Sequence, residues 1–544
     1  MRPAGYLALI KRHTLTCIPP WHRSIIGEKN TSRRLEAQPD GVLETYPRSW
    51  EPEDTTLGHL LFALKHDGVE LGVIAQVLPH LNPRHLVDAL AATPLSAPLR
   101  RLWFLFEWLT GQRLDRPDLS SGNYIPLLDP SRHYTTDRYR SPRQRVVMNA
   151  LGTADYCPQV RRTAILDAFA AKRLDERAAA VSRGVDADLL SRATAYLYTK
   201  ESRTSFEIER ETPTQQRLGR FLRVLEQPPT GSLTKERLIE VHNTIVDAEF
   251  AEPDYRSDQV YIGESIGPGR QRIHYIAPKP AEVPAMMAAL LAGVWNNEAT
   301  AQALATDLRR INGGAGEGTI LRAGSDALDP VVQAAVVGFG FVYLHPFADG
   351  NGRLHRYLIH HVLARRHVTP QGQIIPVSAA ILRDRSGYDR VLETQSRPIM
   401  STLDYSETAD GTVEVLNDSA SLYRYPDLTA HAEYLYAKVE EAIDRDMHDE
   451  IRYLQTYDRA RDHLRTVKHL PDIVENRFLQ FCLQNHGRIA AGKRARYFPM
   501  LDDATIGLME AAVQAAMQEA AYDGSVGASR AEPLSDDGRP GISD

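Results

Sequence analysis

The chain of 544 residues has few cysteines, no long apolar run and no excess of basic charge. Its three cysteines, Cys17, Cys157 and Cys482, lie far apart, which excludes a disulfide framework and a cysteine zinc motif. No segment approaches the roughly 18 consecutive apolar residues of a membrane span. The first few dozen residues also lack the apolar centre of a signal peptide. We therefore expect a cytoplasmic protein with no membrane partner.

The overall composition is that of a globular protein, with 43% hydrophobic and 25% charged residues. The net charge of −6 argues against a protein that binds nucleic acid in bulk. The helix-period spacing of apolar residues predicts a mostly α fold. We expect five segments: an irregular N-terminal segment, a helical extension, a central region, a C-terminal helical domain and a disordered tail, at residues 1–45, 46–170, 171–410, 411–522 and 523–544.

The densest group of chemistry-bearing residues lies in one short stretch of the central region, from His345 to Arg356, with the sequence HPFADGNGRLHR. Apolar residues recur at helical spacing on both sides of it, which predicts a loop between two helices. The Asp-Gly-Asn-Gly turn would feed a helix N-terminus, where backbone N–H groups bind phosphate oxygens.

The side chains of this stretch favour the same kind of ligand. Arg353 and Arg356 are three residues apart, and guanidinium groups match phosphate geometry. Asp349 can hold a Mg²⁺ ion that is otherwise bound by water and phosphates. His345, just before the turn, is placed to accept a proton from a hydroxyl group. Each residue alone has a structural explanation as a cap, turn or solvated face, but the combination predicts a nucleotide site.

The stretch matches the pattern HxFx(D/E)GNGRxxR in full, at eight specified positions in twelve. The chain therefore resembles the Fic (Fido) domain family, including its bacterial members. The resemblance implies a helical core with a small β-hairpin flap, flanked by helical domains. It also implies an adenylyltransferase (AMPylator) that transfers AMP from ATP, with Mg²⁺, to a Ser, Thr or Tyr hydroxyl of a target protein or of the chain itself. His345 would be the base, Asp349 would hold Mg²⁺, and phosphates would bind Gly350, Asn351, Gly352, Arg353 and Arg356.

A second motif lies upstream of this stretch, in a helix expected at residues 189–211. Ser205 and Glu209 are four residues apart and share one helix face. They resemble the inhibitory motif (S/T)xxxE(G/N) of the family, which implies that Glu209 pairs with Arg356 and displaces a phosphate contact. Arg210 departs from the Gly or Asn of the pattern. The alternative is a solvated acidic face made by three alternate glutamates.

Residues 256–277 read as two strands joined by a turn. The segment resembles the flap of the family, a hairpin that holds the target by adding it as an extra strand. The alternative is an ordinary surface hairpin. The residues expected to dock the target are Gln259, Val260, Tyr261, Ile262 and Gly263.

Two further functions remain open from the sequence. The same fold can use another nucleotide donor, such as UTP. Alternatively, the chain is a regulatory protein in which residues 430–520 contact DNA or a partner and catalysis is secondary. A winged-helix-like arrangement there would place Lys493, Arg494 and Arg496 against phosphates, whereas a packing domain would leave them as a solvated basic loop.

Overall fold

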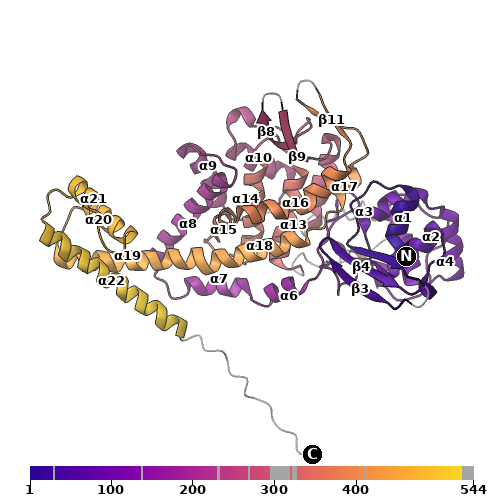
Figure 1. Cartoon of the computed structure of the whole chain (residues 1–544), viewed down its shortest axis with the longest axis horizontal. Coiled ribbons are helices and arrows are strands. Elements are labelled where there is room, and N and C mark those ends of the chain that lie inside the picture. The colour runs from indigo at the N-terminus through magenta and orange to yellow at the C-terminus, as the bar shows by residue number, and fades with distance from the viewer. Residues whose placement is uncertain are drawn as a thin grey trace, which may run out of the picture. The chain divides into compact units, whose positions relative to one another are not determined.

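The computed structural model describes residues 1–28, 31–136, 139–229, 233–267, 270–294, 319–320, 328–408 and 411–529. Helices dominate these residues and the sheets are small, so the prediction of a mostly α fold is confirmed (Figure 1). The chain divides into two compact units. Unit 1 comprises Met1–Ala180 and Tyr198–Ala442, and unit 2 comprises Val181–Leu197 and Ile443–Asp544.

The described part of the first 45 residues forms strands and a helix, so the prediction of an irregular segment is wrong. The helix is α1 (Gly5–His13), and a four-stranded sheet has the order β1-β2-β4-β3, with β2 and β4 parallel. These strands are three to six residues long without regular alternation, and such strands depend on tertiary packing more than on local propensity. The strands are β1 (Arg2–Ala4), β2 (His22–Ile26), β3 (Arg34–Gln38) and β4 (Gly41–Tyr46).

The next segment is helical as expected and also contains a second small sheet. Its helices are α2 (Thr56–His66), α3 (Leu71–Val77), α4 (Pro83–Ala92) and α5 (Ala97–Thr110). The aromatic helix α5 is almost wholly buried and ends at Gly111, which has a φ of 69°. The sheet has the order β10-β6-β7-β5 and is made of β5 (Ile125–Pro126), β6 (Tyr139–Ser141), β7 (Val146–Met148) and β10 (Thr319–Ile320).

The rest of unit 1 is a helical core built around α13 (Pro330–Leu344), which is buried on nearly all sides. A helix that is apolar all round belongs in a core. Helix α14 (Asn351–Arg365) packs along it. The surrounding helices are α6 (Ala164–Ala170), α7 (Leu174–Ser182), α8 (Ala187–Ile208), α9 (Gln215–Leu225), α10 (Lys235–Ile245), α11 (Val283–Val294), α15 (Val377–Arg383), α16 (Arg385–Thr402), α17 (Ala420–Arg424) and α18 (Thr429–Glu441). The end of α7 from Val181 and the first half of α8 up to Leu197 are assigned to unit 2.

Helices α17 and α18 belong to unit 1, although the sequence analysis assigned them to the C-terminal domain from residue 411. The contacts of α18 explain the difference. His431 is fully buried, and its Nε2 lies 2.6 Å from the hydroxyl of Tyr343 in α13. Leu435 and Val439 on the same helix are also fully buried. Such long-range partners are not visible in the local pattern of the sequence.

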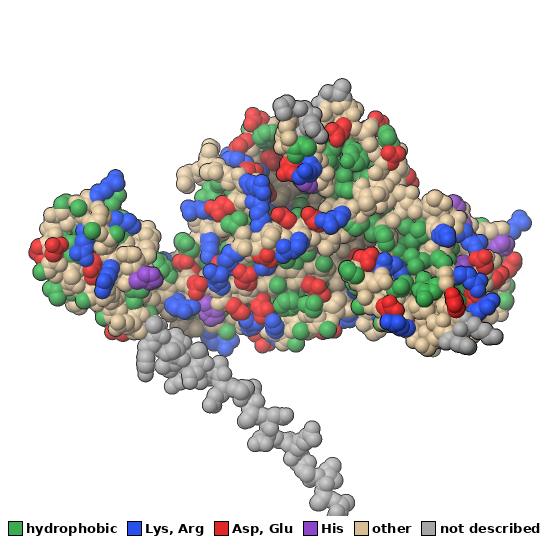
Figure 2. All heavy atoms as spheres, in the orientation of Figure 1, with side chains coloured by type: hydrophobic (Ala, Val, Ile, Leu, Met, Phe, Trp, Pro, Cys, Tyr) green, Lys and Arg blue, Asp and Glu red, His purple; other side chains and the backbone are tan. Residues whose placement is uncertain are grey.

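Two β-hairpins complete unit 1. The first pairs β8 (Tyr261–Gly267) with β9 (Arg270–Ile276), and the second pairs β11 (Tyr405–Glu407) with β12 (Val413–Val415). Val413 and Val415 pack with Ile276 in one apolar cluster, which joins the two hairpins. Figure 2 shows a hollow in the surface beneath the β8–β9 hairpin, with basic and acidic side chains around it.

Unit 2 is helical, with α19 (His448–Val467), α20 (Asp472–Gln484), α21 (Ala491–Tyr497) and α22 (Asp503–Ser529). Its core includes Leu464, Phe478, Leu479 and Met509. Helix α22 continues to Ser529, so the expectation of a disordered tail from residue 523 is wrong for its first residues. The alanine-rich sequence before the tail has strong helix propensity and carries the helix onward. Residues 530–544 lie outside the described part of the chain.

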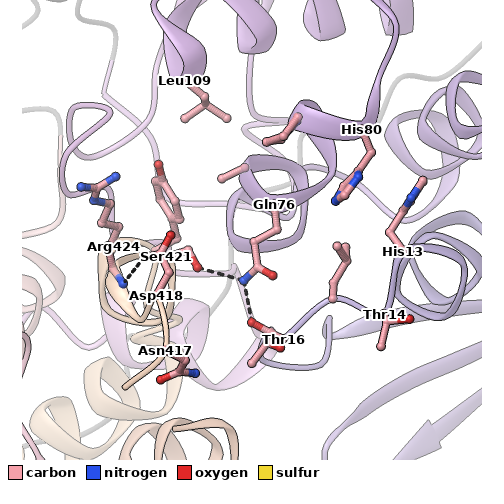
Figure 3. A pocket seen from close by; sticks show the side chains of 15 residues that line it. His13, Thr14, Thr16, Gln76, His80, Leu109, Asn417, Asp418, Ser421 and Arg424 are labelled. Atoms are coloured by element: carbon pink, nitrogen blue, oxygen red, sulfur yellow. Dashed lines mark hydrogen bonds between the residues drawn. The ribbon is translucent and has the colours of Figure 1, made fainter. Parts of the chain in front are cut away.

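None of the described helices combines the length and the apolar character needed to cross a bilayer. A cavity of about 470 Å³ lies in unit 1 between the end of α1, α3 and α17 (Figure 3). Gln76 spans part of it, donating hydrogen bonds to the carbonyl of Thr16 and the hydroxyl of Ser421 at 2.7 and 2.8 Å. Its lining contains no residue of the stretch 345–356.

Candidate active site

The stretch 345–356 forms a tight loop between α13 and α14, as predicted. His345 ends α13 with a φ of 46°, and Gly350 begins α14 with a φ of 79°. A side chain at Gly350 would also collide with Val246, so both the backbone and the space require glycine. Phe347 anchors the loop because its ring is fully buried and stacks on His242 with centroids 4.0 Å apart.

The imidazole of His345 is oriented by its own helix. Its Nδ1 lies 3.2 Å from the carbonyl of Val342, so we assign the Nδ1–H tautomer, which leaves Nε2 as the acceptor. Burial is the main cause that lowers the pKa of His345 to about 4, and the charge of Arg256 also lowers it. The hydrogen bond to Val342 and the carboxylate of Asp349 raise the pKa but do not offset burial. The ring is therefore neutral near pH 7 and able to take a proton.

Arg353 and Arg356 point into one buried region at the start of α14, with 0% and 2% of their surfaces exposed. Nε of Arg356 donates to the hydroxyl of Ser205 at 2.6 Å. Its Nη2 donates to the Ser205 carbonyl at 2.9 Å and to Oε1 of Glu209 at 2.5 Å. The other carboxylate oxygen of Glu209 lies 3.5 Å from Nε of Arg353. One carboxylate thus bridges both arginines.

Glu209 also lies against the N-terminus of α14, because a side-chain carbon on Gly352 would collide with its carboxylate. The first N–H groups of a helix have no partner within the helix, and they attract anions. The carboxylate therefore occupies the place where the sequence analysis expected phosphate oxygens. The structure brings Ser205, Glu209, Gly352, Arg353 and Arg356 together.

The turn that presents Glu209 is a Schellman motif at the end of α8. The N–H of Glu211 donates to the carbonyl of Phe206 at 3.1 Å, and that of Arg210 donates to the carbonyl of Glu207 at 3.0 Å. Arg210 has a φ of 60°. This left-handed conformation suits Gly or Asn, which the resembling pattern has at this position, and it is unfavourable for arginine. The helix ends at Ile208, three residues before the expected end at 211.

Helix α8 is held by a second set of polar contacts, made by Glu201 one turn before Ser205. Glu201 is fully buried, with Oε1 2.7 Å from Nε2 of His360 in α14. Its Oε2 accepts the N–H of Ser378 at 2.9 Å. Glu201, Ser205 and Glu209 are spaced by four residues, so they form one row along the helix. The sequence analysis missed Glu201, although this spacing was visible.

The side chain of Asn351 has hydrogen-bond partners within the loop itself. Its side-chain amide donates to the carbonyl of Phe347 at 2.7 Å and accepts the N–H of Phe347 at 3.2 Å. The side chain therefore braces the loop, and the expected phosphate contact would fall to the backbone N–H of Asn351 at the helix N-terminus.

Asp349 is suited to a metal ion that comes with a nucleotide. Its side chain is 39% exposed, and its Oδ2 lies 3.2 Å from Nη2 of Arg353. Among the described residues, no group of three or more side chains could hold a metal ion. A Mg²⁺ ion bound to one carboxylate, phosphates and water fits this arrangement.

The β8–β9 hairpin begins later than predicted. Gln259 and Val260 precede the strand, and the amide of Gln259 donates to the carbonyl of Ala277 at 2.6 Å. Tyr261, Ile262 and Gly263 lie in β8, and Ile262 is 43% exposed. Two of the five expected docking residues therefore lie outside the strand. The tip of the expected turn, at residues 268–269, lies outside the described residues.

Three residues near the loop were missed by the sequence analysis. His242 stacks on Phe347, and its Nε2 lies 3.1 Å from the carbonyl of Asp349. Oε1 of Glu252 accepts the N–H of Ala348 at 2.7 Å. Arg256 donates to the carbonyl of His345 at 2.7 Å. Each is a single polar residue about 90 to 110 positions from its partner, and no local pattern marks it.

In unit 2, the basic residues proposed for DNA contact have partners within the unit. Nη2 of Arg494 lies 2.7 Å from Oε1 of Glu510, and Nζ of Lys493 lies 4.1 Å above the ring of Phe481. Arg496 lies over the ring of Tyr497 at 5.2 Å. Arg494 would have to leave Glu510 to reach a phosphate.

Residues 232–363 match the model of the Fic/DOC family, and this span includes α10, both strands β8 and β9, α13 and the complete loop. This segment is therefore similar to the Fic/DOC family over about a quarter of the chain. The match supports a Fic-type enzyme, of the class that transfers a nucleotide-derived group to proteins and uses nucleotide triphosphates with metal ions. Glu209 and Ser205 lie outside the matched span.

The solved structures that are similar to this chain include two Fic proteins. One is a Fic family protein from Desulfovibrio desulfuricans G20, with 16% identity, a TM-score of 0.34 and coverage of 63% of this chain and 86% of that chain. The other is a Fic domain containing signaling protein from Bacteroides thetaiotaomicron VPI-5482, with 18% identity, a TM-score of 0.34 and coverage of 52% and 96%.

Proposed function

We propose that the protein is an adenylyltransferase that moves AMP from ATP to a Ser, Thr or Tyr hydroxyl of a protein, and that Glu209 holds it inactive. The observation that carries this proposal is the pair of buried arginines at a helix N-terminus, whose charge is matched by a carboxylate from another segment. A nucleotide triphosphate presents similar negative charge to the same groups once that carboxylate leaves.

The chemistry follows from the orientation of each group. Nε2 of His345 removes the proton from the target hydroxyl as the oxygen forms a bond to the α-phosphorus. The bond from that phosphorus to the β-phosphate oxygen breaks, and pyrophosphate leaves. Arg353, Arg356 and the N–H groups at the start of α14 stabilise the charge on the phosphates. A Mg²⁺ ion at Asp349 would neutralise phosphate charge. The β8 edge offers backbone groups to an extended target segment.

The nucleotide donor is tested with a panel of labelled nucleotides. The variant Glu209→Gly is incubated with ATP, GTP, CTP or UTP labelled at the α-phosphate, and with CDP-choline, in the presence of a lysate. We expect label on protein mainly from ATP. Preferential labelling from UTP or CDP-choline would identify that nucleotide, and not ATP, as the donor. Labelling from none of the donors would contradict transferase activity.

The pH dependence of the reaction should reflect the low pKa of His345. The base must be neutral, and its pKa of about 4 lies below the ordinary value of about 6.5. For Glu209→Gly, kcat/KM for labelling should therefore stay level as pH falls from about 8 to about 5, and decline only as pH approaches about 4. Thermal unfolding at each pH separates acid denaturation from titration. A half-maximal rate near pH 6.5 would contradict the assignment.

The substitution Arg210→Asn should strengthen inhibition. Asparagine adopts the left-handed conformation more readily than arginine, so the turn that aims Glu209 gains roughly 0.5–1 kcal/mol. Basal labelling by the otherwise unchanged chain should fall about two- to fivefold. In the Glu209→Gly background the same substitution should have no effect. Equal effects with and without Glu209 would show that Arg210 influences labelling independently of Glu209.

A further inference from the structure

Arg256 lies just before β8 and ties three separate segments together. Its guanidinium donates to the carbonyl of His345 through Nε at 2.7 Å, to that of Asp258 through Nη1 at 2.7 Å, and to that of Pro278 through Nη2 at 2.6 Å. Its backbone N–H donates to the carbonyl of Pro346 at 2.9 Å. One residue thus contacts the loop that carries the base and both ends of the β8–β9 hairpin.

The environment of Arg256 is unusual for a buried cation. Only 5% of its surface is exposed, and burial lowers its pKa to about 10. Within the described part of the chain, its hydrogen bonds go to carbonyl oxygens and no carboxylate forms an ion pair with it. Burying a charge in this way is costly, so stability alone is a poor explanation. A planar group with fixed donors is, however, well suited to setting three backbone segments at defined distances.

The hydrogen bond from Arg256 to the carbonyl of His345 acts at a residue whose backbone conformation is unfavourable. His345 has a φ of 46°, a conformation that non-glycine residues rarely adopt. Fixing the carbonyls of His345 and Pro346 holds this turn, and with it the direction of the imidazole. The bonds to Asp258 and Pro278 hold the base of the hairpin at the same place.

We propose that Arg256 is a positioning residue that sets the β8–β9 hairpin against the turn of His345, so that a hydroxyl presented on β8 meets Nε2 of the base. This inference rests on the proposed transfer reaction. Arg256 has no contact with Arg353, Arg356 or the start of α14 among its hydrogen bonds. Its loss should therefore impair the chemical step and leave ATP binding intact.

The test uses the full chain with Glu209→Gly, in which Arg256→Ala is added. Label incorporation into the chain itself or lysate proteins is measured against ATP concentration. We expect kcat to fall about 100-fold, the scale of a displacement near 1 Å, while KM for ATP changes less than about twofold. Guanidinium ion, added well below denaturing concentrations, should restore part of kcat by filling the vacated site. A rise in KM with unchanged kcat would overturn the proposal.

Arg100 provides the matched control. It is 3% exposed, lies in the N-terminal helical region and also donates to three backbone carbonyls, those of Gln144, Asn123 and Arg145. Arg100→Ala should lower thermal stability similarly while kcat and KM stay unchanged and guanidinium has no effect on rate. If Arg100→Ala lost as much kcat as Arg256→Ala, the effect of Arg256→Ala would be explained by general destabilisation, and the positioning role would be rejected.

Hydrogen exchange tests the geometry without relying on activity. In Arg256→Ala, amide exchange should accelerate in residues 256–267, 270–278 and 345–347, and stay unchanged in 354–365. If Glu209→Gly labels nothing, the transfer function fails while this measurement still decides whether Arg256 joins the segments. If the alanine variant does not fold, Arg256→Lys keeps the charge without the planar fork, and it should show the same loss of kcat. Unchanged exchange and unchanged kcat would refute the proposal.

Discussion

Replacing Glu209 by glycine should raise the transfer of label from α-labelled ATP to protein by about 10- to 100-fold. The carboxylate bonds Arg356 at 2.5 Å and approaches Arg353 at 3.5 Å, so its removal frees both cations for phosphate. The expected factor corresponds to a coupling of about 1–3 kcal/mol between inhibitor and substrate sites. Labelled proteins in a lysate, separated and identified by mass spectrometry, provide the readout and the first candidates for a target.

The matched control is Glu207→Gly. Glu207 is exposed on the same last turn of α8, two residues from Glu209, so glycine there weakens the helix similarly without releasing the arginines. This variant should stay close to the basal rate. If Glu209→Gly leaves labelling unchanged, Glu209 is not an inhibitor, and if Glu207→Gly activates equally, helix fraying rather than the carboxylate controls the site.

Adding His345→Ala to Glu209→Gly should lower labelling by about 10²- to 10⁴-fold, the range for loss of a general base. Nε2 of His345 is the free acceptor of a ring whose Nδ1 is bonded to Val342. Among the described residues, the hydrogen bonds of His345 do not involve Arg353 or Arg356, which are proposed to bind phosphate, so ATP affinity, measured by calorimetry, should change little.

His85→Ala, added to Glu209→Gly, serves as the control for this prediction because His85 is exposed in α4, within the N-terminal helical region. Labelling by this double variant should equal that of Glu209→Gly alone. Retention of more than a tenth of the activity by the His345 variant would show that another group, or water, accepts the proton. A large loss of ATP affinity would instead assign His345 a binding role.

The parts of the site that lie close together in sequence were predictable. The loop 345–356 combines turn residues with flanking helical patterns, and local backbone preferences decide both. Ser205 and Glu209 were singled out by their resemblance to the inhibitory motif, and their four-residue spacing placed them on one helix face. Their pairing with Arg356 was implied only by resemblance, because no local rule joins residues almost 150 positions apart.

The features of the fold and of the site that were not predicted from the sequence share one physical origin. The sheet β1-β2-β4-β3 depends on packing between short strands, and Arg256, Glu252 and His242 act through partners far along the chain. The resemblance implied that Asn351 binds phosphate, and the sequence pattern did not show that its side-chain amide pairs with the backbone of Phe347. A residue type indicates what a side chain can bind, but tertiary structure decides which partner it meets.

The position of Glu209 at the very end of α8 has a kinetic consequence. The last turn of a helix frays on fast timescales and at low free-energy cost, whereas Glu201, one attachment earlier, is fully buried. Under the proposed function, the carboxylate would act as a tethered competitor of ATP with a high effective concentration, and Glu201 would keep the preceding turns of the helix attached while the carboxylate exchanges. The proposed inhibition would then set a threshold, in which the uninhibited fraction rises with ATP concentration and activity follows the supply of nucleotide.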